Sequence, residues 1–174
     1  MGKKIIRFGL SVRDIDRAMR ELEQYKQDII RKTDLLREKV AERLAELSRD
    51  GFAGAVVDDL LKGGQRTAQV DVSIDQRSNI TLVIARGEDA VWVEFGAGVH
   101  YNGSGAGTSP HPKGSELGFT IGGYGKGMGK KDVWGFYEDG KLRLTHGAPA
   151  TMPMYDAVKT VCDEIAEIAR EVFQ

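Results

Sequence analysis

The segment between Gly96 and Gly129 carries 12 of the 22 glycines of this 174-residue chain and almost no aliphatic side chains. Glycine supplies no side chain to a core and loses the most backbone freedom on folding, so this density excludes a conventional core element. Connections of this length are usually functional or disordered. We therefore expect a single domain over residues 1–174 that is interrupted by a long flexible loop at about residues 96–132.

The composition is that of a globular protein, with 41% apolar and 29% charged residues. A formal net charge of -1 gives no general attraction to nucleic acid or to an anionic membrane. No apolar run is long enough to cross a bilayer, so we expect no membrane partner. The single cysteine, Cys162, excludes an intramolecular disulfide, and its apolar neighbours at helical spacing predict a buried thiol.

Helical and strand periodicities predict an α+β fold, in which a long N-terminal helix and a C-terminal helix pack on an antiparallel sheet. Ser11, followed three residues later by Asp14, resembles a capping box and predicts a helix that continues to Ser48 and ends near Gly51. An amphipathic pattern over residues 154–173 predicts the last helix.

The shorter elements follow from alternation and turn signals. The segment 91–95 is apolar but too short for periodicity to separate strand from helix. The remaining expectations are a strand at 4–8, a helix at 52–61, a hairpin over 70–84 and a second hairpin over 133–144 around Glu138-Asp139-Gly140.

The long helix has apolar residues in two rows with a seven-residue spacing. Lys26 and Thr33 interrupt the second row, whereas a regular coiled coil would keep both rows apolar. Either the helix packs on its own sheet along part of its length, or its overhanging portion packs against a neighbouring subunit. The first row is Ile15, Leu22, Ile29 and Leu36, and the second holds Met19, Val40 and Leu47.

Two enzyme hypotheses rest on residues in and beside the glycine-rich loop. The three histidines, His100, His111 and His146, could form a metal site, but none has the spacing that places two ligands on one helical face. Residues 122–131 resemble a phosphate cradle without the Walker spacing. A loop-based metal- or phosphate-dependent hydrolase is therefore the alternative function. The lysines of this segment, which could also contact DNA phosphates, are Lys126, Lys130 and Lys131.

Aromatic residues gather at the end of the loop and in the hairpin that follows it. They either fill one face of the hairpin or form a protein contact, since Trp and Tyr are frequent anchors of interfaces. These residues are Tyr124, Trp134, Phe136 and Tyr137.

Two short motifs complete the pattern: Val93-Glu94-Phe95-Gly96-Ala97-Gly98, and Gly147-Ala148-Pro149-Ala150 leading through Met152-Pro153-Met154 into the last helix. In this order, after a long helix and a hairpin, they resemble the neck or tail-completion proteins of long-tailed bacteriophages and prophages. Ala97 stands where the family usually has Thr, and Met154 where an aromatic residue is common.

The resemblance implies a structural, non-enzymatic protein without a cofactor or small-molecule substrate. Such a protein joins or completes the tail at the head–tail interface of the virion, after assembly in the host cytoplasm. It implies a ring of identical subunits, expected to be a hexamer, which contacts connector or adaptor and tail-tube proteins and through which DNA could pass. A small regulator or toxin-type binding module is a third reading. The residues predicted to contact subunits or partners are Glu94, Phe95, Gly96, Tyr124, Lys126, Lys130, Lys131, Trp134, Phe136 and Tyr137.

Overall fold

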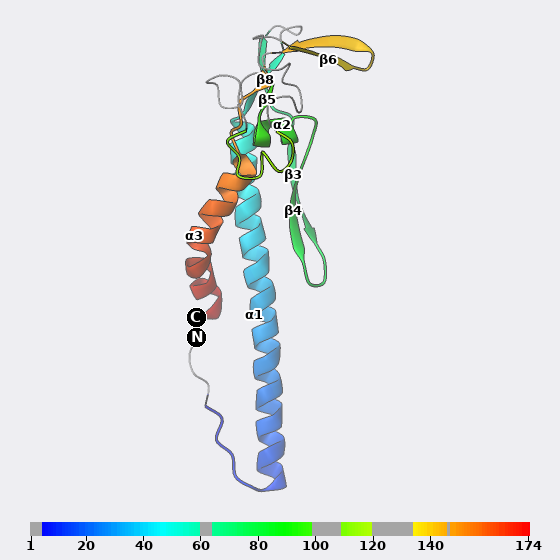
Figure 1. Ribbon diagram of the computed structural model, residues 1–174. Helices are drawn as coiled ribbons and strands as arrows, with labels where there is room; N and C mark the ends of the chain where they lie inside the picture. The colour runs from blue at the N-terminus through cyan, green and yellow to red at the C-terminus, as the bar shows by residue number, and fades with distance from the viewer. Residues whose placement is uncertain (1–4, 60–63, 99–108, 120–133, 146) are drawn as a thin grey trace.

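The protein is built on one long helix, α1 (Val12–Ala53), whose 42 residues span about 63 Å. The computed structural model describes residues 5–59, 64–98, 109–119, 134–145 and 147–174. A second helix, α3 (Pro153–Phe173), lies along the C-terminal part of α1, and the strands and the short helix α2 (Ala90–Phe95) gather around the same end (Figure 1). The predicted α+β class, with a long N-terminal helix and a C-terminal helix, is confirmed.

The strands form antiparallel pairs instead of the one sheet expected. Within the described residues each sheet contains two strands. The strands Trp134–Glu138 and Lys141–Thr145 form the predicted second hairpin, which is confirmed, with Asp139 and Gly140 at its turn at φ of 50° and 72° as this turn requires. The pairs are β1 (Val56–Asp59) with β2 (Gly64–Thr67), β3 (Asp71–Gln76) with β4 (Thr81–Arg86), β5 (Ala97–Gly98) with β8 (Gly147–Ala148), and β6 (Trp134–Glu138) with β7 (Lys141–Thr145).

The start of α1 confirms the predicted cap, and its end differs from the prediction. The Ser11 hydroxyl oxygen accepts a hydrogen bond from the Asp14 amide at 3.2 Å and donates one to the Asp14 carboxylate at 2.7 Å. The helix continues past Gly51 to Ala53, where Gly54 caps it. Gly51 serves helix packing instead of termination, because a Cβ added there would lie 2.7 Å from the Cβ of Pro153 in α3.

Two of the predicted short elements are wrong. Residues 52–59 do not form a separate helix, because the first two belong to α1 and Val56–Asp59 pairs with β2. Residues 60 and 61 lie outside the described residues. Backbone pairing with Gly64–Thr67 supplies hydrogen bonds that the sequence of one segment cannot reveal. Residues 5–8 form no strand, and Lys4 lies outside the described residues.

The hairpin β3–β4 confirms the prediction for residues 70–84, and the structure adds its register. Val72 stands opposite Ala85, and Ile74 opposite Val83. These four side chains belong to the core or pack against it. A shift of one residue would have turned the other set of β4 side chains to the core, which is why alternation in the sequence left the register open.

The main core cluster lies at the C-terminal end of α1, where the helix meets the β3–β4 hairpin and both motif segments. Farther along, α3 is fixed to α1 by ion pairs that join Arg43 to Glu164 at 2.8 Å and Lys39 to Glu171 at 3.1 Å. The last contact joins Lys32 Nζ to the backbone oxygen of Gln174 at 3.2 Å, so residues 12–31 extend beyond α3. The core consists of Ala45, Phe52, Ala55, Val57, Val72, Val93 and Ala148.

Cys162 is exposed, so the predicted buried thiol is wrong. The buried positions of α3 include Ala157 and Val161, which face α1. One residue farther on, the helix has turned by about 100°, and this rotation carries Cys162 out of the contact.

The pair between α1 and α3 makes stability depend on pH. Hydrogen bonds from Arg43 to Glu164 lower the pKa of this carboxylate below its ordinary value. A lowered pKa in the folded state stabilises the protein above the pKa of the unfolded state, and this contribution is lost as the pH falls through the folded value. We expect Glu164→Gln to lower the free energy of unfolding at neutral pH, and the difference from the wild type to shrink as the pH falls below the ordinary glutamate pKa of about 4.3.

Urea denaturation followed by circular dichroism over this pH range measures the difference. Glu167→Gln, at an exposed position of the same helix, is the matched control and should change little at either pH. A Glu164→Gln deficit that stays constant over the whole range would contradict the pH linkage.

Candidate functional site

The two sequence motifs, residues 93–98 and 147–154, meet in one structural unit. β5, which follows α2, pairs with β8 through Ala97 opposite Ala148 and Gly98 opposite Gly147. The Thr151 amide then donates a hydrogen bond to the Val93 carbonyl at 3.0 Å. The labels of α2, β5 and β8 lie together near one end of α1 in Figure 1. The motif that leads into α3 is therefore attached along its length to the motif that begins in the last turn of α2.

Glu94 is the central residue of this unit, and its carboxylate caps α3. One oxygen accepts the Met154 amide at 2.8 Å and the other accepts the Tyr155 amide at 2.9 Å. These are free N–H groups of the first turn, where the helix dipole also favours negative charge. Pro153 has no N–H, and Met152 provides no side-chain cap. A residue from α2 thus performs the role that Ser, Thr, Asp or Asn usually performs within the helix's own sequence.

Met152 adds a local cost to the start of α3. Its φ of 53° and ψ of 44° place it in the left-handed region, which a residue with a Cβ adopts at a cost of about 1–3 kcal/mol. The hydrogen bonds of the neighbouring Thr151, Met154 and Tyr155 to α2 hold the chain in this turn. The geometry before α3 therefore depends on tertiary contacts.

His111 brings a third segment to the same carboxylate. Its Nε2 lies 3.4 Å from Glu94 Oε1, and its Nδ1 accepts the Lys113 amide at 3.0 Å. Because Nδ1 is an acceptor, Nε2 carries the proton of the neutral ring and points it at Glu94. Both ring nitrogens are therefore engaged within the chain.

Aromatic rings surround this contact. Phe95 lies between His111, at 4.3 Å between ring centroids, and Phe119, at 4.7 Å. The Tyr155 ring meets His111 edge-on at 5.3 Å. Buried His111 and Phe119 hold residues 109–119 against α2 and α3, so this part of the predicted flexible loop is packed. The remaining parts, 99–108 and 120–132, lie outside the described residues.

A second buried carboxylate, which the sequence did not single out, holds the beginning of α2. Asp89 accepts two hydrogen bonds from the guanidinium of Arg66, at 2.6 and 3.0 Å, and one from the Gln69 amide at 2.8 Å. A bidentate pair of this kind fixes orientation as well as charge. It ties β2 and the chain after it to α2, and so positions Glu94 one and a half turns farther on.

The predicted contact residues divide into three groups. Glu94 and Gly96 are buried within the chain, where Glu94 caps α3, and Phe95 is half-buried beside it. Their contacts with other subunits stay predictions. Tyr137 is 77% exposed on β6, and its cross-strand partner Leu142 is 46% exposed. Trp134 and Phe136 belong to β6, but their side chains are outside the described part, as are all of Tyr124, Lys126, Lys130 and Lys131.

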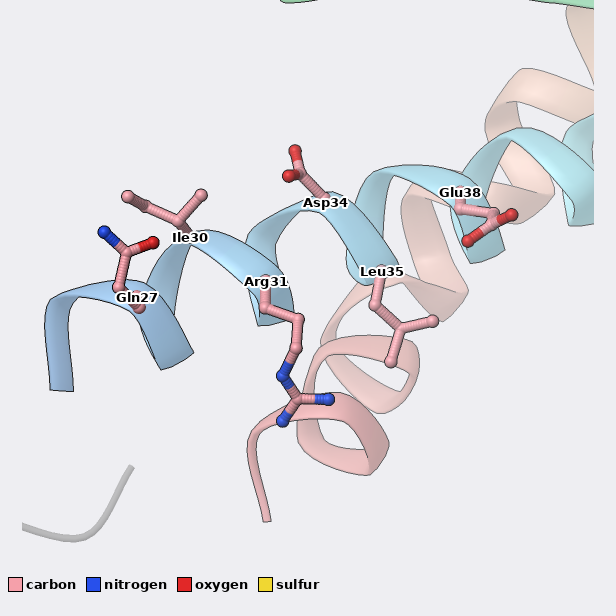
Figure 2. Close-up of a pocket in the computed structure, with 6 residues that line it drawn as sticks. All are labelled: Gln27, Ile30, Arg31, Asp34, Leu35 and Glu38. Carbon is pink, nitrogen blue, oxygen red and sulfur yellow. The ribbon is translucent and has the colours of Figure 1, made fainter. Parts of the chain in front are cut away.

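The candidate enzyme residues do not assemble in the part of the chain that the structure describes. There, no three His, Cys, Asp or Glu side chains are placed to hold a metal ion. His100, His146 and the glycine-rich segment 122–131 lie outside it. A shallow depression on α1 is lined by six side chains of that one helix, which fan out from it without converging (Figure 2); they are Gln27, Ile30, Arg31, Asp34, Leu35 and Glu38.

Comparison with protein-family models, curated proteins and solved structures finds no match to this chain. Among the described residues, no helix has the length and apolar character needed to span a bilayer. The candidate site is therefore assigned from the contacts within this chain alone.

We expect Glu94→Gln to reduce the free energy of unfolding by about 1–3 kcal/mol, because glutamine replaces one of the two acceptor oxygens by an NH2 donor, which leaves one of the two backbone N–H groups unpaired. Glu88→Gln, an exposed position just before α2, is the matched control and should be near neutral. Urea unfolding and hydrogen exchange at the first turn of α3 measure the effect. Equal stability of the two variants would contradict the capping role.

Proposed function

We propose that this protein is a structural component of a long-tailed bacteriophage or prophage, which joins or completes the tail at the head–tail interface as a ring of identical subunits. The observation that carries the proposal is the union of the two motifs that resemble this family. The carboxylate of Glu94, in the first motif, accepts the Met154 and Tyr155 amides at the start of α3, which follows the second motif, at 2.8 and 2.9 Å. The residues that bear the resemblance thus share one physical task.

The placement of apolar surface supports an assembly role. The core occupies one end of α1, while the β6–β7 hairpin projects from that end (Figure 1). Tyr137 and Leu142 stand opposite each other on this hairpin and are exposed. Tyr is a frequent anchor of protein interfaces, so this pair provides a contact for a neighbouring subunit or for a tail protein.

The shape of the molecule gives further support. Residues 12–31 of α1 extend away from the core by about 30 Å, much farther than a compact domain requires. Elongated parts of this kind gain their stabilising contacts in an assembly. In the proposed ring, expected to be a hexamer, the neighbours are connector or adaptor and tail-tube proteins, and DNA could pass through the lumen. The virion neck is the proposed location.

No specific observation favours the hydrolase alternative. His111, the one histidine of the three within the described residues, uses Nδ1 to accept the Lys113 amide and directs Nε2 at Glu94. The Glu94 carboxylate is in turn occupied by two backbone amides. Within the described residues, both groups are engaged in contacts that hold the fold together.

The test is deletion of the gene from a phage or prophage that encodes this chain, followed by electron microscopy of the particles. We expect DNA-filled heads and separate tails, and joined particles after complementation with the wild-type chain. A Tyr137→Ala/Leu142→Ala double variant should complement at least tenfold less well, since it removes the exposed apolar pair without touching the core.

Lys141→Ala is the control on the opposite face of the hairpin, and it should complement fully. Circular dichroism of the purified variants verifies that the fold is retained. Normal numbers of joined, infectious particles without the chain would overturn the proposed function.

A further inference from the structure

The extension of α1 beyond α3 presents a stripe of large apolar side chains that are 40–77% exposed, although Ala18 beside the stripe is buried. Its members follow helical spacing, so they project from one face of the helix. In a free subunit such a row of large apolar side chains is exposed to water at a cost that burial against a partner would remove. The stripe consists of Val12 (77% exposed), Ile15 (40%), Met19 (63%), Leu22 (55%) and Ile30 (46%).

The stripe continues a face that is already an interface elsewhere on the same helix. Farther along, Leu36, Val40 and Leu47 carry on the heptad rows and are half-buried where α3 and the β3–β4 hairpin pack on α1. Beyond the Lys32–Gln174 contact α3 has ended, but the apolar pattern persists for about five more turns. In Figure 1 this lower part of α1 lies beyond both α3 and the hairpin.

We propose that residues 12–31 of α1 pack in parallel, at the same height, against the same segment of a second copy of this chain. The flanking charges select this arrangement. Asp16 and Glu23 are exposed and border the stripe on one side, while Ala18, which is buried, and Tyr25, which is half-buried, border it on the other. In a parallel pair, the acidic flank of one helix lies against the uncharged flank of the other. In an antiparallel pair, the two acidic flanks would lie against each other and repel.

Lys26 within the heptad rows sets the strength and register of this contact. Its ammonium group lies 3.7 Å from Glu23 of the same helix, which partly neutralises it. A single lysine at a core position lowers the stability of a coiled coil but specifies its register and number of strands. Association through this segment alone is therefore weak, and a ring with further contacts reinforces it.

In a closed ring with cyclic symmetry, equivalent segments of neighbouring subunits are parallel and lie at the same height. The pairing of α1 segments within a ring therefore rests on the proposed function. The pairing itself depends only on the stripe and its flanks. An end-shifted contact, such as the stripe against α3 of another copy, would instead displace each subunit along the helix axis and build an open filament.

Cross-linking of the full-length chain tests the parallel arrangement. Because Cys162 is exposed, Ile15→Cys and the control Gln24→Cys are both made in a Cys162→Ser background. Gln24 is exposed on the opposite face of the same helix. At high protein concentration a short bismaleimide should convert Ile15→Cys to a covalent dimer at least tenfold faster than Gln24→Cys. An antiparallel pair would place Ile15 near residues 26–28 of its partner and slow this reaction to the control rate, which would overturn the proposal.

A second variant separates this inference from the proposed function. Leu22→Glu should weaken self-association in sedimentation velocity at least tenfold, with unchanged helix content, whereas Gln24→Glu should not. If rings form although Ile15→Cys does not cross-link and although Leu22→Glu is present, the parallel pairing of α1 is overturned and the proposed ring is not affected. If the α1 segments cross-link as expected but phage particles join heads to tails without the chain, the inference is upheld and the proposed head–tail joining function is overturned.

Discussion

The structure depends on the Glu94 carboxylate, which binds the first free amides of α3 from outside that helix. Pro153 offers no N–H and Met152 no cap, so the start of α3 is satisfied only when α2 is in place. α2 is itself held by the Arg66–Asp89 pair. A chain of buried charge contacts therefore leads from the β1–β2 hairpin through α2 to α3, and α3 covers α1. Such buried, paired carboxylates specify one arrangement because their loss leaves donors unsatisfied.

This concentration of contacts divides the molecule into a stable head and two outlying parts. The core and both motifs occupy the C-terminal end of α1, and the β6–β7 hairpin and the first half of α1 extend from it. Both outlying parts expose large apolar side chains, such as Tyr137 and Leu22. A rigid head with apolar extensions suits a subunit that is completed by its neighbours, and it gives the proposed ring two separate surfaces for assembly.

Local signals predicted a large share of the fold. The Ser11 cap, the β3–β4 and β6–β7 hairpins and the last helix follow from capping, alternation and turn chemistry, and the structure confirms each. The failures arise where a distant partner decides. Residues 56–59 became a strand because β2 pairs with them. Cys162 is exposed because α3 rotates it away from α1, and a single helix pattern does not say how wide its buried face is.

By itself the sequence determined α1, α3, the β3–β4 and β6–β7 hairpins and the two motifs, because capping, periodicity and turn residues act over a few neighbouring positions. It also contained one sign of the site: a helix that begins Met152-Pro153 without a polar cap must be capped from elsewhere. Only the tertiary structure decided that Glu94 is that cap, that the His111 ring contacts its carboxylate, and that the apolar face of α1 extends beyond the end of α3. These facts depend on contacts between segments tens of residues apart, which no local pattern encodes.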